Sequence, residues 1–341
     1  MFRRGEIGLV VAIVVVIAST IALDPLRTYY ASPYASLEQI LRHTSMLGIF
    51  ALGSAIVIIA GGIDLSVGSM IAFAGSICAS ILLVLAPTEL AEGQPVGLGI
   101  ITLAVAGTLF VGFLVGSLHA WLITVVGLPP FIATLATLVG LRSLSRAMVE
   151  GVTATVYGGF KSQIEINDER FRYLATNVWI PVALFVVLAA AAWLLMSRTV
   201  VGRHLYALGG NEAATRLSGI RTERLKWLAY CIGAMLSSVA GILYVADQSV
   251  AAPQTLGQGY ELNAIAAAVV GGCSLQGGFG TIPGTVLGCL FLRVVVDGIA
   301  KIIKSGADVY EGLIVGIVVV FAVAFNQLRS VRSGTRQVFP G

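Results

Sequence analysis

Long apolar runs separated by short polar segments dominate the pattern of this chain. A helix that spans a lipid bilayer needs about 20 predominantly apolar residues. Stretches that meet or approach this length cover 7–23, 44–60, 67–86, 96–126, 127–141, 178–196, 227–246 and 312–328. The uncharged run 262–292 is long enough for two passes, but glycines interrupt it at 271–272 and 277–280, which predicts two shorter helices joined by a turn. The pattern therefore predicts about ten transmembrane helices.

Composition and periodicity exclude other classes of protein. Of the 341 residues, 57% are hydrophobic and only 11% are charged, whereas a soluble globular domain carries about 25% charged residues. No stretch shows the alternation of apolar and polar residues that is typical of membrane-spanning strands. We therefore expect an all-α polytopic membrane protein in which residues 1–341 form a single transmembrane domain.

The sequence lacks the motifs of common catalytic and nucleotide-binding sites. No GK dipeptide occurs, which excludes a Walker A phosphate loop, and the three isolated histidines form no H-E-x-x-H zinc motif. A G-x-S-x-G nucleophile elbow is also absent. The 21 Lys and Arg residues are scattered between apolar segments and form no basic stripe that would bind nucleic acid. We expect a chain that is not an enzyme and that has no cofactor, metal or nucleic-acid partner.

Basic residues near the ends of the apolar runs indicate the orientation in the membrane. Six of them lie in the loop 197–226, three in the C-terminal tail and two in the N-terminal tail. With ten spans, both termini and this loop share one side, which the positive-inside rule makes the cytoplasm. The opposite loops carry nine basic residues, so the two sides differ little in their number of basic residues. The opposite loops also hold most of the acidic residues.

Two glycine-rich breaks share the pattern G-G-x-x-L-x-x-G, at 61–68 (GGIDLSVG) and at 271–278 (GGCSLQGG). Glycine breaks in corresponding positions of two halves indicate an internal repeat and a transport pathway. At the first break, Asp64 or Ser66 either caps the helix that follows or lines this pathway. The polar pathway candidates near the second break are Asn263, Ser274 and Gln276. Hydrogen bonding between helices is the alternative role for these three residues.

Small residues and one charged pair mark further positions inside the spans. Arg293 and Asp297 lie one helical turn apart, so they can pair with each other or extend toward the interface. G-x-x-x-G pairs predict close contacts between helices. There are three such pairs: Gly112/Gly116, Gly284/Gly288 and Gly312/Gly316.

The loop 197–226 contains signals for a short helix in water. Asn211 is a favourable N-cap, Glu212 complements the positive end of the helix, and Gly219 is a suitable C-terminal stop. An isolated helix of this length is marginally stable. Docking into a groove on a partner would stabilise it, whereas a plain solvated connector is the alternative.

These features together resemble the membrane permease subunits of ATP-binding-cassette importers for monosaccharides, a family that includes ribose, xylose, galactose and autoinducer-2 permeases. The resemblance covers about 44–326 and rests on four blocks in order, which are 61–75 (GGIDLSVGSMIAFAG), 128–135 (LPPFIATL), 202–220 and 261–272 (ELNAIAAAVVGG). It implies alternating access between two permease protomers in a bacterial inner membrane. It also implies a cytoplasmic ATPase that docks on the loop 197–226 and an external sugar-binding protein.

The resemblance assigns the coupling to the ATPase to one segment of this loop. The residues it implies are Glu212, Ala213, Ala214, Arg216 and Gly219. One departure is visible, because the better-known coupling motif has its glycine six residues after the Glu of EAA and ends in Leu-Pro. Here Gly219 follows Glu212 by seven residues and no Leu-Pro follows.

The sequence is compatible with three functions. The small number of charges within the spans favours a small neutral sugar, or a sugar-like molecule, that moves along a path of Ser, Thr, Asn and Gln side chains. A secondary transporter driven by an ion gradient, with Asp64 as the coupling site, is the alternative. A membrane scaffold whose loop recruits a soluble protein is a third hypothesis, but it leaves the two glycine breaks unexplained.

Overall fold

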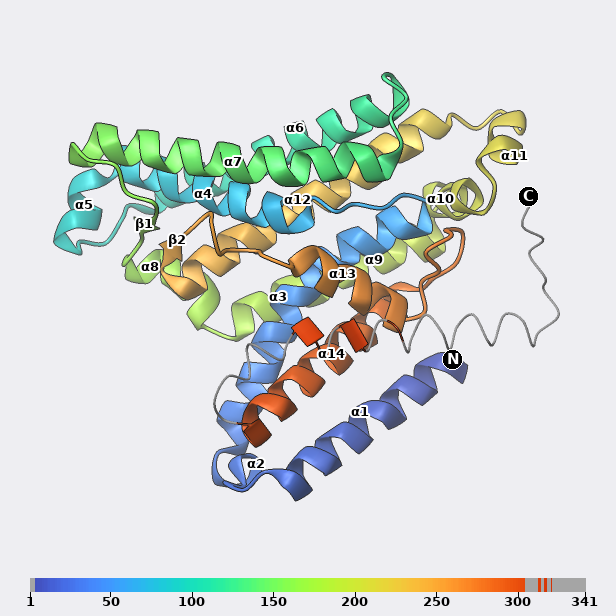
Figure 1. Cartoon of the computed structure of the whole chain (residues 1–341), viewed down its shortest axis with the longest axis horizontal. Coiled ribbons are helices and arrows are strands. Elements are labelled where there is room, and N and C mark those ends of the chain that lie inside the picture. The colour runs from blue at the N-terminus through green and yellow to red at the C-terminus, as the bar shows by residue number, and fades with distance from the viewer. Residues whose placement is uncertain (1–3, 304–311, 314–315, 318–319, 321–341) are drawn as a thin grey trace.

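The computed structural model describes residues 4–303, 312–313, 316–317 and 320. Helices account for almost all of the secondary structure in these residues (Figure 1). The long helices are α1 (Arg4–Leu23), α3 (Pro33–Ile59), α4 (Val67–Leu85), α6 (Leu98–Thr124), α7 (Pro130–Tyr157), α9 (Trp179–Arg198), α12 (Thr222–Gln248) and α14 (Ile282–Ile303). The shorter helices are α2 (Thr28–Ala31), α5 (Pro87–Glu92), α8 (Glu169–Thr176), α10 (Val200–Gly210), α11 (Glu212–Leu217) and α13 (Tyr260–Val270).

A small sheet and one capping residue close the end of the bundle opposite α11 (Figure 1). The strands β1 (Ile164–Glu165) and β2 (Val250–Ala251) pair antiparallel. Next to them, Asp168 caps α8, because its Oδ1 accepts a hydrogen bond from Phe171 N at 2.6 Å. Its Oδ2 accepts a second from Val96 N at 2.7 Å. One carboxylate thus fastens the segment before α6 to the start of α8.

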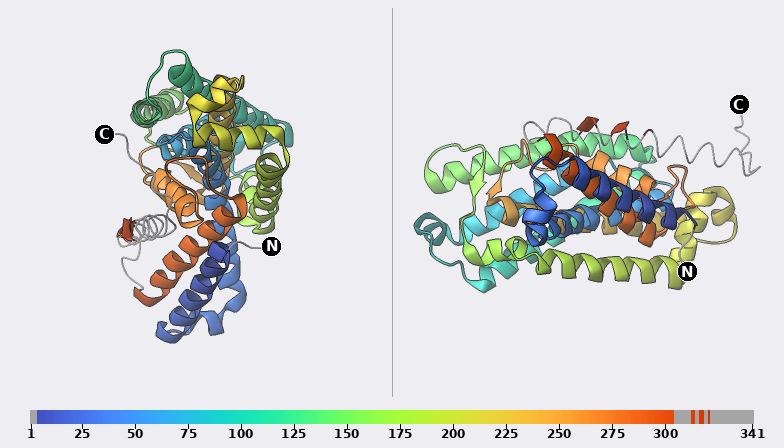
Figure 2. Two further views of the ribbon diagram at one scale, coloured as in Figure 1. Left: turned by 90° about the vertical axis from the view of Figure 1, so that its right-hand side faces the viewer. Right: turned by 90° about the horizontal axis from the view of Figure 1, so that it is seen from below.

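Three helices form the centre of the molecule. α12 packs against α3, α4 and α6, and α4 also packs against α7. α3 and α4 are buried along most of their length, whereas α1, α6, α7 and α9 bury only part of their surface. α1 and α14 lie side by side at one edge of the bundle and pack against each other (Figure 2). The central helices are therefore shielded from the surroundings by the outer ones.

Glycines bring several helices into close contact, as two of the three G-x-x-x-G pairs predict. On α6, a Cβ built at Gly116 would lie 2.6 Å from the Cα of Cys231 on α12. The pair on α14 faces α13 at similarly short distances. Both pairs let backbones approach more closely than any larger residue would allow. A Cβ at Gly312 or Gly316 would meet nothing within 4 Å, so the third pair makes no such contact among the described residues.

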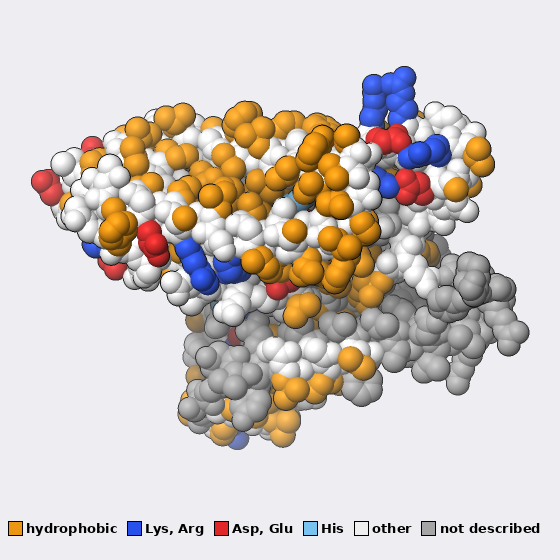
Figure 3. Space-filling view, turned by 45° about the horizontal axis from the view of Figure 1, so that its top comes forward, with side chains coloured by type: hydrophobic (Ala, Val, Ile, Leu, Met, Phe, Trp, Pro, Cys, Tyr) orange, Lys and Arg blue, Asp and Glu red, His pale blue; other side chains and the backbone are white. Residues whose placement is uncertain are grey.

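The outer surface is apolar over the helices that surround the core. Phe110 on α6, Val139 on α7 and Val187 on α9 are 62%, 61% and 64% exposed. Figure 3 shows apolar side chains covering the face over α6 and α7, with charged side chains gathered toward its two ends. Within the part of the chain that the structure describes, seven helices are long and apolar enough to cross a membrane. The expected all-α polytopic membrane fold is confirmed.

The apolar runs predict where helices lie better than where they end. Each predicted span before residue 293 corresponds to a helix, and the run 262–292 forms two helices, α13 and α14, as expected. α13 has 11 residues, a length of about 16 Å, so it cannot cross a bilayer alone. α7 continues past the predicted end at 141 to Tyr157. The predicted span 312–328 lies mostly outside the described residues.

The two glycine breaks end their helices with the same local structure. Gly61 after α3 and Gly272 after α13 have φ angles of 82° and 93°. In each case the glycine NH donates to the carbonyl three residues earlier, and the next NH donates to the carbonyl five residues earlier, all at 2.9 Å. This is the Schellman motif. The shared motif aligns Gly61 with Gly272. The sequence pattern aligns Gly61 with Gly271, so the two alignments differ by one residue.

Candidate functional site

A cavity of about 570 Å³ lies between α3, α12, α13 and α14, and Gly312 and Gly316 also line it. Small-molecule sites in proteins commonly enclose about 300–1,000 Å³. The aromatic and polar side chains in its walls are His43, Phe50, Tyr244, Asp247, Gln248, Gln258, Tyr260, Asn263 and Arg293. These residues come from distant parts of the sequence, so tertiary packing creates the cavity.

Aromatic rings form one wall of the cavity. The rings of Phe50 and Tyr260 stack with centroids 5.8 Å apart and planes 7° from parallel. Tyr244 lies 5.0 Å from Tyr260, with its ring tilted by 53°. Aromatic rings present large flat apolar faces, and tyrosine adds a hydroxyl at the edge. The wall therefore suits a ligand that has both an apolar face and hydrogen-bonding groups at its rim.

Charged side chains near the cavity are already engaged with other protein groups. Arg42 Nη1 donates to Asp247 Oδ1 at 3.1 Å, and both side chains are partly buried. Arg293 Nη2 lies 2.9 Å from His43 Nδ1. One turn along α14 from Arg293, Asp297 accepts a hydrogen bond from Tyr29 and pairs with Lys301. The cavity thus offers hydrogen-bonding groups, while the charge of its Asp247 is compensated by the neighbouring Arg42.

The structure separates the predicted pathway residues. Asn263 lines the cavity. Asp64 and Ser66 lie between α3 and α4, where they are 4% and 1% exposed. Asp64 Oδ1 accepts hydrogen bonds from Ser66 N at 2.8 Å and from Ser66 Oγ at 2.6 Å. Ser66 occupies the N-cap position of α4 without a capping bond from its side chain. Asp64 therefore closes a buried turn before α4, and neither its side chain nor that of Ser66 caps this helix.

Polar contacts from two helices hold this buried turn. Tyr230 Oη on α12 donates to the Ile63 carbonyl at 3.4 Å, and Thr134 Oγ1 on α7 accepts from Leu65 N at 3.2 Å. The ring of His119 on α6 packs edge-on against Tyr230, with centroids 6.2 Å apart. A buried polar segment is stable only when its groups have partners. The first glycine break is therefore a fixed part of the core.

Ser274 and Gln276 lie in the turn between α13 and α14. Ser274 N donates to the Phe279 carbonyl at 2.9 Å, and Gln276 N donates to Ser274 Oγ at 3.2 Å. Neither residue lines the cavity, and Gln276 is exposed. The turn lies next to α10, because Tyr206 on α10 donates a hydrogen bond to Gly280. Both residues shape the second break, at a distance from the aromatic wall.

The predicted helix in the loop 197–226 is present as α11. Asn211 Oδ1 accepts a hydrogen bond from Ala214 N at 2.9 Å, as expected of an N-cap, and Gly219 follows the helix with a φ of 80°. Glu212 pairs with Lys226 of α12 at 2.7 Å, and Arg216 pairs with Glu223 at 2.6 Å. These ion pairs hold α11 against the start of α12.

The sequence analysis does not identify one exposed apolar residue of α11. Leu217 is 90% exposed, more than any other large apolar side chain among the described residues. It follows Ala213 by four residues, and Ala213 and Ala214 are also exposed. This spacing places Leu217 on the same side of the helix as Ala213. The i, i+4 spacing was visible in the sequence, but only the structure shows that this surface is uncovered.

Comparison with known proteins identifies permeases. The family described as branched-chain amino acid transport system permease component matches residues 36–323. The ribose import permease protein of Escherichia coli (strain K12) is 37% identical over 318 residues, which are 92% of this chain and 91% of that protein. The ribose import permease protein of Bacillus subtilis (strain 168) is 32% identical over 326 residues, 95% of this chain and 92% of the relative.

A permease named for another sugar is also similar. The galactose/methyl galactoside import permease protein of Escherichia coli (strain K12) is 30% identical over 331 residues, 96% of this chain and 95% of that protein. No solved structure matches the chain significantly.

Proposed function

This chain belongs to the family of permease components described for branched-chain amino acid transport systems, and we propose that it carries a small neutral sugar or sugar-like molecule across the membrane. It is the permease of an ATP-binding-cassette importer. Relatives that are similar over more than nine-tenths of both chains are named for ribose and for galactose. These names and the chemistry of the cavity favour a sugar over an amino acid.

The aromatic wall is the observation that supports a sugar most directly. A sugar ring presents C–H groups on its faces and hydroxyl groups around its edge. The faces can pack on the partly exposed ring of Tyr260, which stacks on the buried Phe50, and the hydroxyls can bond to polar side chains such as Asn263. A branched-chain amino acid carries a carboxylate and an ammonium group, and each needs an opposite charge when it leaves water. Arg42 and Asp247 already compensate each other.

The docking element for the ATPase is α11. Ala213, Ala214 and Leu217 form an exposed, largely apolar surface on this short helix, which suits insertion into a groove on a partner. Ion pairs from Glu212 and Arg216 to α12 hold the helix in place. The ATP that drives transport is hydrolysed in the partner, because this chain has no phosphate-binding loop.

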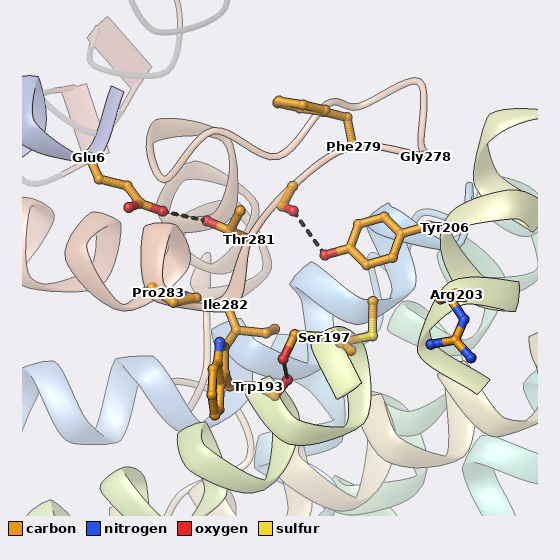
Figure 4. A pocket seen from close by; sticks show the side chains of 12 residues that line it. Glu6, Trp193, Ser197, Arg203, Tyr206, Gly278, Phe279, Thr281, Ile282 and Pro283 are labelled. Carbon is orange, nitrogen blue, oxygen red and sulfur yellow. Dashed lines mark hydrogen bonds between the residues drawn. The ribbon is translucent and has the colours of Figure 1, made fainter. Parts of the chain in front are cut away.

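Orientation and further partners complete the proposal. The permease lies in a bacterial inner membrane, with both termini and α11 in the cytoplasm, together with a second permease protomer and an external sugar-binding protein. Glu6 at the start of α1 and Arg203 of α10 line one pocket of about 670 Å³ (Figure 4). α1 therefore begins at the end of the bundle that carries α11. This supports the placement of the N-terminus and α11 on the same side of the membrane. The basic residues of the C-terminal tail, outside the described residues, support the same placement.

Transport by the assembled importer tests this function. The permease is reconstituted in proteoliposomes with its ATPase and its binding protein, and uptake of labelled ribose, galactose and leucine is measured. We expect uptake of a sugar that depends on ATP, and no uptake of leucine. Uptake of leucine, or sugar uptake by the permease alone under an ion gradient, would contradict the proposal.

A further inference from the structure

α10 meets both glycine breaks at a contact made of backbone, which we define as Gly61, Gly209, Gly277 and Gly278 and call the glycine junction. Gly278 N donates to the Ile59 carbonyl at 2.9 Å, which joins the turn before α14 to the end of α3. A Cβ built at Gly209 would overlap this Ile59 oxygen and would lie 2.5 Å from Gly278 N. Only glycine at position 209 lets α10 pack against both glycine breaks.

A tyrosine on α10 adds a side-chain link to the same junction. Tyr206 lies one turn before Gly209, and its hydroxyl donates to the Gly280 carbonyl at 2.9 Å (Figure 4). The pocket of about 670 Å³ borders Tyr206 and the segment from Gly278 to Pro283. The turn between α13 and α14 is therefore packed tightly against Gly209 of α10, and next to this contact the turn and α10 together line an open pocket.

The helices that leave the junction are walls of the aromatic cavity. α3 ends at Ile59, and Phe50 lies nine residues earlier on the same helix, about 14 Å away. α13, which carries Tyr260 and Asn263, ends at the same turn from which α14 starts. The fourth wall, α12, is joined to α11 by the Glu212–Lys226 pair. The α10–α11 segment thus contacts or connects to α3, α12, α13 and α14, which supply most of the cavity wall.

We propose that Tyr206 and Gly209 are positioning residues for energy coupling. They hold the ends of α3, α13 and α14 against α10, so that a displacement of α10–α11 by the ATPase changes the shape of the cavity. Contact between backbones without intervening side chains transmits such a displacement with little slack, because packed interiors are poorly compressible. This inference rests on the proposed docking of the ATPase at α11, and neither residue touches the cargo.

Adjacent glycines provide a matched pair of variants for the test. Gly209→Ala inserts a methyl group into the junction, whereas a Cβ at Gly210 would meet nothing within 4 Å, so Gly210→Ala is the control. Each variant is reconstituted with the ATPase and the binding protein, and the number of sugar molecules imported per ATP hydrolysed is measured. We expect this ratio to fall at least tenfold in Gly209→Ala and to stay unchanged in Gly210→Ala. The ATPase should copurify equally with both variants.

A milder variant distinguishes a loss of coupling from misfolding. Tyr206→Phe keeps the ring and removes the hydroxyl that bonds to Gly280. We expect it to lower the transport ratio about three- to tenfold, in keeping with the loss of one hydrogen bond of about 0.5–1.5 kcal/mol, with the KM for the sugar and the binding of the ATPase unchanged.

The possible outcomes separate this inference from the proposed function. An unchanged ratio in both Gly209→Ala and Tyr206→Phe, with the ATPase bound, would overturn the inference and leave the proposed function standing. Loss of ATPase binding in Gly209→Ala together with wild-type behaviour of Tyr206→Phe would also overturn it, because the junction would then serve folding alone. A wild-type chain that binds no ATPase would overturn the proposed function and, with it, the inference.

Discussion

Phe50 of α3 and Tyr260 of α13 stack with their ring planes 7° from parallel in the wall of a cavity. The contact connects a long buried helix to a helix of 11 residues that cannot cross the membrane alone. Because the two rings lie in one stack, the position of α13 determines whether the cavity has a flat wall. In the proposed function, the stack therefore links the shape of the second glycine break to the recognition of the sugar.

Removal of the Tyr260 ring should weaken binding of the sugar. Aromatic contacts of this kind contribute about 0.5–1.5 kcal/mol, so we expect Tyr260→Ala to raise the KM for uptake roughly three- to tenfold with little change in ATPase binding. Tyr260→Phe is the matched control, because it keeps the stacking face. Equal KM values in Tyr260→Ala and the wild type would show that the sugar does not contact this wall.

The Arg42–Asp247 pair should respond differently to single and double changes. Asp247→Asn leaves the Arg42 charge without its partner, which should destabilise the protein by about 1–3 kcal/mol and reduce uptake. The double variant Arg42→Gln with Asp247→Asn removes both charges, and we expect it to recover most of the stability and part of the uptake. Thermal unfolding and transport are measured on the wild type, the single variant and the double variant. No recovery in the double variant would indicate that one of the charges acts on the cargo itself.

Acidic residues on α11 should prevent docking of the ATPase. Replacement of Ala213 and Ala214 by Asp puts two charges on an exposed surface that we expect the ATPase to bury. Copurification of the ATPase should fall at least tenfold, while membrane insertion of the permease stays intact. Ala91→Asp, on exposed α5 at the opposite end of the molecule (Figure 1), is the control. Undiminished copurification would refute the docking role.

Leu217 should contribute to ATPase affinity without contributing to the stability of the permease. Its side chain is 90% exposed in the free chain, and burial of a leucine in a partner is worth about 1.5–3 kcal/mol. Leu217→Ser should therefore weaken ATPase binding at least tenfold, as measured by titration in detergent or nanodiscs. The unfolding midpoint of the permease alone should not change. A lower midpoint would mean that Leu217 packs within the permease.

Gly116 should tolerate no side chain, unlike a glycine on the outer surface. A Cβ at position 116 would lie 2.6 Å from backbone of α12, which cannot rotate away as a side chain can. Gly116→Val should lower the unfolding midpoint by at least ~5 °C, since overpacking costs about 1–3 kcal/mol or more. Gly140→Val on α7 has nothing within 4 Å and should behave as the wild type. Similar midpoints for the two variants would contradict close packing of α6 on α12.

Local features of the fold could be predicted because their causes are local. Lipid requires about 20 apolar residues for each crossing, so the apolar runs show where helices lie. The end of α7 was missed because Arg142 interrupts the apolar run. In the structure Arg142 donates to the carbonyls of Pro253 and Leu256 at 2.8 and 3.0 Å, which gives its charge partners and lets the helix continue. Those carbonyls are distant in the sequence, so no local pattern indicates them.

The chain's own pattern was sufficient for the membrane class, the positions of the long helices up to α14, the two breaks and the capped helix α11, since each depends on the solvent or on a few adjacent residues. Tertiary packing alone decided that Asn263 faces an aromatic cavity while Asp64 closes a buried turn. It alone brought Gly209 against both breaks. These relationships join residues of different helices, and which faces of those helices meet depends on packing of the whole bundle.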